Sequence, residues 1–400
     1  MKSKLLIALD NKWLLLGLYL AAALWTLVVH YAGDAAGGLG YNNYDIYTGV
    51  ARHFFDELPL YGHSPSEYHD MNHYGPLFAF LIYPFTLFPR LAGLALWVAF
   101  TAIIYWWAIR CLPLARSVVG IILVMCLPEF YNAALYQQFN TVTAALIVCT
   151  WITITSGHEA TAAALIVVGS MVKIYGIVGL AFFFFIPPSR RWYFVRSLLL
   201  WTVALLVLQL IFTSWDYLWS QYVAWGNDLV GKHGTNIFSP FQNRGLLGMI
   251  RKLTGSASYS DMWVLVPAMV IYCSAYLRYR HFDERRFRFL FLASTLLFIV
   301  LFSSGTETPS YIMAMTGVSL WWFAARSSHT VLDWCLLCFV FIGTFANAIF
   351  PHALYLEVIF AYALKALPFS LVWLKIMYEL TLSYRKIDGK QENFDCCTSL

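Results

Sequence analysis

The chain has 400 residues, of which 60% are apolar and only 12% charged, and its formal net charge is +5. Soluble domains average about 25% charged residues, so this composition excludes a protein whose whole surface faces water. The modest charge gives no sign of a nucleic-acid partner, whereas the 18% share of aromatic residues suits a protein with membrane interfaces. We therefore expect an all-α, polytopic membrane protein.

Apolar runs long enough to cross a bilayer recur along the chain. A helix rises about 1.5 Å per residue, so roughly 17–25 apolar residues cross about 30 Å of hydrocarbon. Two segments are short or broken: 76–89 contains Pro84, and 160–187 carries Lys173 in its middle, which predicts two short helices going in and out again. With these the prediction is about 10 to 12 spans, and the longer runs are 13–30, 91–109, 118–135, 140–156, 197–214, 262–279, 288–304, 309–325, 331–350 and 354–381.

Basic residues predict the orientation, because cytoplasmic loops carry an excess of Lys and Arg. A cytoplasmic N-terminus puts 18 of the 26 basic residues inside, namely Lys2, Lys4, Lys12, Arg110, Arg116, Arg190, Arg191, Arg196, Arg278, Arg280, Arg285, Arg286, Arg288, Arg326, Lys375, Arg385, Lys386 and Lys390. Two polar loops, near 31–75 and 215–260, then lie outside. We expect an inner (plasma) membrane protein with both termini cytoplasmic, one transmembrane domain over 1–385, and a short cytoplasmic tail at 386–400.

The first polar loop holds a candidate general base, Asp45. From this residue onward the apolar positions share one helical face, which predicts a short helix with the carboxylate at its start: Ile46, Gly49, Val50, His53 and Phe54. The helix dipole keeps such a carboxylate ionised, and it can accept a proton from a sugar hydroxyl. The alternative is that Asp45 only caps the helix. Its rivals as a base in the same loop are Asp34, Asp56 and Asp70.

Four positions farther along the chain are candidates for substrate contacts. Tyr74 stands in a turn before a helix start, and Gln138 and Asn140 lie between two spans, where amides bind sugar hydroxyls or cap helix ends. Lys173 lies within an apolar segment, which costs several kcal/mol and marks a functional candidate. Its ammonium can neutralise a lipid phosphate, unless it snorkels from a helix end as a structural residue.

The second loop and the segment near residue 307 add further polar candidates. Arg244 and Arg251 can hold a phosphate or contact anionic headgroups non-specifically, and Asn243 lies beside them. Glu307 is an isolated acid at a broken helix end, where it binds a sugar hydroxyl or caps the helix. No His/Cys cluster or Asp-x-Asp pair with ligand spacing occurs, so we expect no metal and no cofactor.

In their order, these motifs resemble glycosyltransferase family 87, within the GT-C membrane fold. The early family motif is matched by Asp45-Ile46, Tyr47, Ala51 and Leu60-Tyr61, and the later ones by Tyr74-Gly75-Pro76-Leu77, Gln137-Gln138-Phe139-Asn140, Val172-Lys173-Ile174, Gln242-Asn243-Arg244…Arg251 and Ser304…Glu307-Thr-Pro-Ser-Tyr311. The chain departs from the family pattern in lacking the first Pro of Tyr-Pro-Pro-Leu, the Gly of Gly-Gln-x-Asn and the Pro of Leu-Lys-Pro. The resemblance covers roughly residues 40–325.

The resemblance implies a metal-independent, inverting transfer of a hexose, mannose above all, from a polyprenyl-phosphate donor to an extracytoplasmic glycan or glycolipid, within the lipid membrane. Asp45 is then the base, and the donor phosphate falls to Lys173, Arg244 and Arg251. The expected sugar and acceptor contacts are Tyr44, Tyr74, Gln138, Asn140, Asn243 and Glu307. A non-enzymatic transporter or flippase of lipid-linked saccharides is the alternative, because it too shows broken helices and intramembrane charge. A structural subunit of an envelope assembly is a third possibility.

Overall fold

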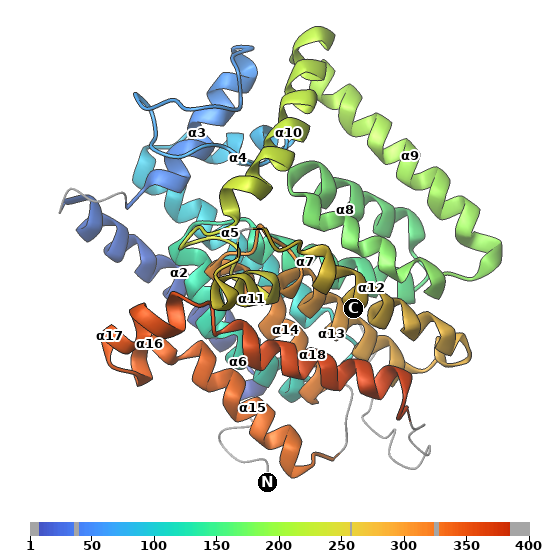
Figure 1. Cartoon of the computed structure of the whole chain (residues 1–400). Helices are drawn as coiled ribbons and strands as arrows, with labels where there is room; N and C mark the ends of the chain where they lie inside the picture. The colour runs from blue at the N-terminus through green and yellow to red at the C-terminus, as the bar shows by residue number, and fades with distance from the viewer. Residues whose placement is uncertain (1–7, 36–39, 257, 324–327, 385–400) are drawn as a thin grey trace. The chain divides into compact units, whose positions relative to one another are not determined.

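The computed structural model describes residues 8–35, 40–256, 258–323 and 328–384, and the described chain is helical with no strand (Figure 1). Five of its helices are long and apolar enough to cross a membrane: Lys12–Gly33, Arg90–Arg110, Arg116–Leu135, Pro188–Leu210 and Met262–His281. The prediction of an all-α polytopic membrane protein is confirmed. Shorter apolar helices cover Asn140–Thr155, Glu159–Val172, Ile174–Phe185 and Val331–Thr344, so the expected count of 10 to 12 spans stays a prediction.

The chain forms two compact units. The first comprises Leu16–Cys111 and Phe130–Lys232, and the second comprises the rest of the described chain. Boundaries between them fall within α2 (Lys12–Ala35), α6 (Arg116–Leu135) and α10 (Trp215–Asn236), so these helices contribute to both units. The predicted single domain over 1–385 stays a prediction, and the predicted tail lies outside the described residues.

The first unit is built from the end of α6 (Arg116–Leu135) and nine further elements. These are α2 (Lys12–Ala35), α3 (Asn42–Phe55), α4 (Phe78–Thr86), α5 (Arg90–Arg110), α7 (Asn140–Thr155), α8 (Glu159–Val172), the 3-10 helix η1 (Ile174–Phe185), α9 (Pro188–Leu210) and α10 (Trp215–Asn236). Helix α3 packs on α4, α5 on α7, and α8 lies between α7, η1 and α9 (Figure 1). The expected pair of short helices over 160–187 is therefore confirmed as α8 and η1, which break at Lys173.

The second unit holds the start of α6 and the remaining elements. These are α11 (Leu246–Thr254), α12 (Met262–Ser274), η2 (Ala275–His281), α13 (Arg285–Leu301), η3 (Thr308–Ser310), α14 (Tyr311–Phe323), α15 (Val331–Thr344), α16 (Ala346–Ile349), α17 (His352–Leu354), the π-helix η4 (Tyr355–Phe360) and α18 (Ala366–Thr381). Helix α13 is almost wholly buried between α14 and α18.

One predicted span, over residues 354–381, is not a single continuous helix. We expected a single helix over 354–381, but the chain passes through the π-helix η4 and a turn before α18 begins at Ala366. Ala363 has a φ of 54° in that turn, a left-handed conformation that a continuing helix does not contain. The apolar pattern alone carries no sign of this break, because the residues around the turn are themselves apolar.

Candidate active site

Helix α3 carries Asp45 in its first turn, as the sequence predicts. The predicted face of the helix is buried: Ile46, Gly49, Val50, His53 and Phe54. The N-cap of the helix is Tyr41, so the alternative that Asp45 is the cap is wrong. A carboxylate in the first helical turn interacts favourably with the helix dipole.

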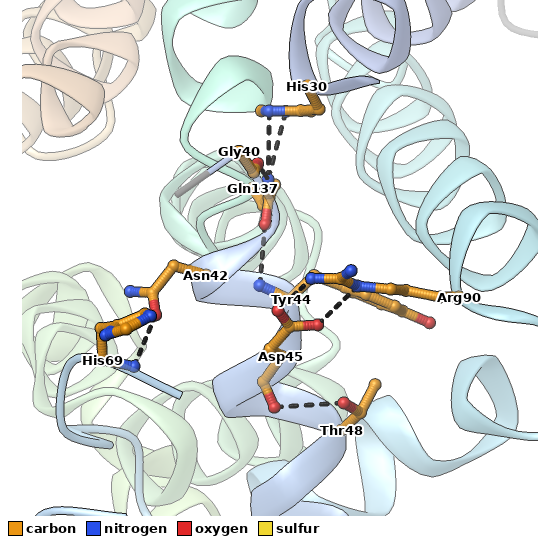
Figure 2. A network of polar contacts seen from close by, with 9 residues as sticks. All are labelled: His30, Gly40, Asn42, Tyr44, Asp45, Thr48, His69, Arg90 and Gln137. Carbon is orange, nitrogen blue, oxygen red and sulfur yellow. Dashed lines mark hydrogen bonds and ion pairs between the residues drawn. The ribbon is translucent and has the colours of Figure 1, made fainter. Parts of the chain in front are cut away.

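The Asp45 carboxylate forms a two-pronged ion pair with Arg90, the first residue of α5 (Figure 2). The Arg90 Nε donates to Oδ1 at 2.8 Å and its Nη2 donates to Oδ2. The guanidinium also lies 4.4 Å from the ring centroid of Tyr41. The Asp45 side chain is 24% exposed and that of Arg90 is 48% exposed, so the pair is accessible to a ligand. An arginine partner favours the ionised carboxylate.

Sequence reasoning missed Arg90 as a site residue. It was one of the basic residues outside the cytoplasmic set, and it directly follows Pro89 at the start of an apolar run. Its partner stands 45 positions earlier in the sequence, so no helical spacing links them. The available signal was an arginine on the side expected to be poor in positive charge.

Next to the ion pair, Gln137 joins three segments of the first unit (Figure 2). Its Oε1 accepts from the backbone N–H of Tyr44 at 2.7 Å, and its Nε2 donates to the Gly40 carbonyl at 2.8 Å. Nε2 also lies 3.2 Å from Nε2 of His30. Gln137 has a φ of 57°, the left-handed region that favours glycine, and it occupies the place of the glycine in the family pattern. Where the family pattern has glycine, this chain thus has a residue whose side chain forms hydrogen bonds to α3 and to Gly40.

A chain of polar contacts runs from Lys173 through two of the predicted amides. The Lys173 Nζ donates to Asn140 Oδ1 at 2.6 Å, and Asn140 Nδ2 donates to Gln138 Oε1 at 2.5 Å. Lys173 ends α8 with an extended backbone, and its ammonium lies 5.0 Å from the ring centroid of Tyr175. The ammonium is thus directed at the start of α7.

Tyr74 links this chain to α3. Its hydroxyl lies 3.2 Å from that of Tyr47, its ring centroid lies 5.6 Å from the Lys173 ammonium, and it accepts from the Phe139 N–H at 3.4 Å. The next residue, Gly75, donates its N–H to the Val172 carbonyl at 2.9 Å. Four of the predicted residues, Tyr74, Gln138, Asn140 and Lys173, are therefore brought together in one unit.

Tyr44, another predicted sugar contact, has no exposed surface. Its side chain is fully buried, and its hydroxyl donates to the Phe85 carbonyl at 3.0 Å. Burial first, and the Asp45 charge second, raise the pKa of Tyr44 to about 12. The phenol thus stays neutral and fixes α3 against the end of α4, so the expected sugar contact has no exposed surface to use.

Within the same unit, His73 and Asp228 form a pair that the sequence did not indicate. The His73 Nδ1 lies 2.8 Å from Asp228 Oδ2, and Trp225 Nε1 donates to the His73 carbonyl at 3.2 Å. The Gln221 Oε1 accepts from the Leu60 N–H at 2.9 Å. These contacts hold α10 against the segment that carries Tyr74.

The predicted phosphate ligands of the second unit differ in their surroundings. Arg251 is 2% exposed and pairs with Asp261 at 2.6 Å, while its Nη2 also donates to the Tyr259 carbonyl at 2.7 Å. These contacts indicate a structural role, which spacing alone does not separate from a phosphate-binding one. Arg244 is also buried; its Nη1 donates to the Pro240 carbonyl at 2.7 Å and its guanidinium lies 3.7 Å from the Phe360 ring centroid.

Lys252, which follows Arg251 in the sequence, is a second cation beside this segment. Its Nζ donates to the Gln242 carbonyl at 3.1 Å and to that of Asn243 at 3.4 Å. Burial first, and the Arg244 charge second, lower the pKa of Lys252 to about 8. Asn243 is buried with a φ of 49°, and its Oδ1 has no hydrogen-bond partner. The segment therefore combines two cations with an unsatisfied amide oxygen.

Glu307 is the N-cap of η3. It forms a capping box with Ser310, whose hydroxyl accepts from the Glu307 N–H at 3.2 Å. Of the two roles the sequence left open for Glu307, the structure shows the cap. Among the described residues no group of three or more His, Cys, Asp or Glu is placed to hold a metal ion.

Comparison with known proteins agrees with the motifs. The family model of glycosyltransferase family 87 matches residues 72–304, more than half of the chain. The match covers four candidate residues of the first unit, Tyr74, Gln138, Asn140 and Lys173, together with Arg244 of the second. A search of curated proteins finds no significant match. The chain belongs to glycosyltransferase family 87 and is a membrane glycosyltransferase.

Proposed function

We propose that the protein transfers a hexose, with mannose as the first candidate, from a polyprenyl-phosphate donor to an extracytoplasmic glycan or glycolipid. Membership of family 87 supports glycosyl transfer, and the membrane helices fit a substrate with a lipid tail. The charge bias of the loops supports a plasma-membrane location with the acceptor bound outside.

The proposed reaction needs a base and a cation. The acceptor hydroxyl oxygen attacks the anomeric carbon from the face opposite the phosphate, which inverts the configuration. The bond from that carbon to the phosphate oxygen breaks, and its electron pair leaves with the polyprenyl phosphate. The hydroxyl proton passes to Asp45, and Lys173 stabilises the charge that grows on the departing phosphate.

The observation that carries this proposal is the presence of both groups on one scaffold within the first unit. The segment 136–140 contacts α3, which bears Asp45, and it also holds the amides that receive the Lys173 ammonium. Arg90 binds both carboxylate oxygens of Asp45 and so fixes the orientation of the proposed proton acceptor. Tyr74, which contacts Tyr47 of α3, and the bonded amides Gln138 and Asn140 are the proposed donors and acceptors for sugar hydroxyls.

The test is transfer by the purified protein in lipid nanodiscs. Polyprenyl-phosphate-mannose and an envelope glycolipid extract are supplied, and products are identified by mass spectrometry. We expect a glycolipid heavier by one hexose, and an Asp45→Asn variant slower by about 10²–10⁴-fold, the usual contribution of general-base catalysis. Donor binding should change little, because asparagine keeps the size of the side chain.

Matched controls come from the exposed rivals in the same loop. Asp56→Asn and Asp70→Asn should transfer nearly as fast as the wild type, since both side chains lie on the surface. His73→Gln removes a further group that pairs with a carboxylate in the same unit. If Asp45→Asn turned over at a near-normal rate and one of these three variants were inactive, the base would be that other residue and not Asp45. Movement of the lipid-linked sugar across vesicles without any transfer would favour the flippase alternative.

A further inference from the structure

We propose that Gln137 is a positioning residue that holds α3 and α5 together so that Asp45 meets Arg90. This inference rests on the proposed role of Asp45 as the base. Gln137 lies in the turn between α6 and α7, 3% exposed, and touches neither charged group of the pair. It acts through the two helices that carry them.

The Gln137 side chain fixes the first turn of α3. The N–H groups of a helix's first turn have no partner within the helix. The N-cap residue Tyr41 supplies no side-chain hydrogen bond, but Gln137 Oε1 accepts from the Tyr44 N–H at 2.7 Å (Figure 2). The first turn of α3 is thus capped by a residue 93 positions away in the sequence. The capped N–H belongs to Tyr44, which directly precedes Asp45.

Two further side-chain hydrogen bonds tie the same two segments, one donated from each segment. The Asn43 Nδ2 donates to the Tyr136 carbonyl at 2.8 Å, while Gln137 Nε2 donates to the Gly40 carbonyl at 2.8 Å. The start of α3 is therefore joined to the turn by side chains from both partners. We call these contacts the α3 latch, made by Asn43 and Gln137.

The backbone carbonyl of Gln137 reaches the other helix. It accepts from Trp97 Nε1 at 2.8 Å, and Trp97 lies fully buried in α5. Arg90 stands seven residues before Trp97 in that helix, which is two turns, so the two residues lie on the same side of α5. One residue thereby bonds to the helix that bears the carboxylate and to the helix that bears the guanidinium.

The backbone conformation indicates that the side chain matters here. A φ of 57° is unfavourable for a residue with a Cβ, and glycine would adopt it without that penalty. Glycine, however, offers no group for the Tyr44 N–H or the Gly40 carbonyl. The hydrogen bonds of the glutamine amide offset the strained backbone, and Gln137→Gly removes these bonds without adding backbone strain.

The experiment compares turnover and local order in Gln137→Gly and Asn43→Ala. Misplacing a reacting group by about 1 Å costs up to 10²-fold in rate, so we expect kcat to fall about 10- to 100-fold in Gln137→Gly. The KM for polyprenyl-phosphate-mannose should stay within about twofold, because the Lys173 contacts are untouched. Amide hydrogen exchange over residues 41–47 should become faster. Asn43→Ala, which leaves the backbone at 137 unchanged, should move each measurement in the same direction.

Two further variants sharpen the test. Adding Gln137→Gly to Asp45→Asn should slow the enzyme little beyond Asp45→Asn alone, because both changes act on one group. Ala363→Gly places glycine at another left-handed position, in the second unit, and should leave kcat unchanged.

The outcomes separate this inference from the proposed function. Wild-type transfer together with normal kcat and normal exchange in both latch variants would overturn the latch and leave the function standing. Absence of transfer by the wild type with this donor would count against the proposed function. Hydrogen exchange would still decide whether Gln137 orders α3.

Discussion

At the scale of single residues, the candidate site pairs each charged group with a specific partner. Asp45 meets a guanidinium and Lys173 meets an amide oxygen. A ligand of Arg90 must displace a carboxylate from a bidentate, charge-assisted contact. A ligand of Lys173 must displace only the neutral amide oxygen of Asn140. At Lys173 an anionic ligand therefore competes with the Asn140 amide, whereas at Arg90 it competes with a carboxylate.

Lys173→Met should weaken binding of the donor while the fold is kept. Methionine has a similar length and suits an apolar segment, but it cannot contact a phosphate. We expect the Kd for polyprenyl-phosphate-mannose, measured by intrinsic fluorescence in nanodiscs, to rise at least tenfold, with an unchanged melting temperature. An unchanged Kd would show that Lys173 serves only to bond Asn140.

Lys252 predicts a pH dependence of stability above neutrality. Its folded-state pKa is about 8, below the ordinary value of 10.5, so the folded state binds fewer protons than the unfolded state between these values. The free energy of unfolding should accordingly rise with pH through the window from 8 to 10.5. The destabilising effect of the buried charge is fully present below pH 8. Melting temperatures of wild type and Lys252→Met at pH 7.5 and 9.5 check this: the variant should lose that rise, and an equal rise in both would contradict it.

At the scale of elements, close backbone contact between residues 73–75 and 171–173 sets the position of Tyr74 beside Lys173. A Cβ on Gly75 would lie 2.0 Å from the Met171 carbonyl oxygen and 2.9 Å from the Trp225 ring. Both neighbours are held in place, the first as backbone and the second by its bond to His73. The segments can therefore approach only with glycine at this position.

Gly75→Ala should damage both stability and donor binding. Forcing one methyl group into a packed contact costs about 1–3 kcal/mol, and here it would break the bond between the Gly75 N–H and Val172. Gly226→Ala in α10 is the matched control, since a Cβ there meets no atom within 4 Å and alanine favours a helix. Thermal unfolding should show a lower melting temperature for the first variant and an equal or higher one for the second. A stable Gly75→Ala enzyme would mean that the segments can separate without loss.

Sequence patterns predicted elements better than they predicted partners. The break at Lys173 and the buried face of α3 follow from local spacing, and both are confirmed. Arg90 and the pair of His73 with Asp228 were missed because each contact depends on tertiary packing that no local pattern encodes. The π-helix and turn before α18 were missed for a related reason, since an apolar run has the same composition whether or not it is continuous.

At the scale of the whole molecule, the charge asymmetry makes a prediction about topology. Eighteen of the 26 basic residues fall on one side in the predicted arrangement, and the two long polar loops fall on the other. These loops contain α3 and α10 in the first unit and α11 in the second, so the elements that carry Asp45, Asp228 and Lys252 share the predicted outer side. Lys2 and Lys386, both predicted to be cytoplasmic, lie outside the described residues.

Cysteine labelling in intact cells tests this topology. The eight native cysteines are replaced first, and single cysteines are then introduced at exposed positions. Asp70→Cys in the first loop and Val230→Cys in α10 should react with a membrane-impermeant maleimide from outside, while Ser189→Cys should react only after the cells are lysed. These sites avoid Asp45 and Lys173, so each variant should remain active and can be checked for transfer. Labelling of Ser189→Cys in intact cells, with Asp70→Cys protected, would show that the topology is inverted. The candidate site would then lie on the cytoplasmic side. Its donor and acceptor would have to be cytoplasmic as well.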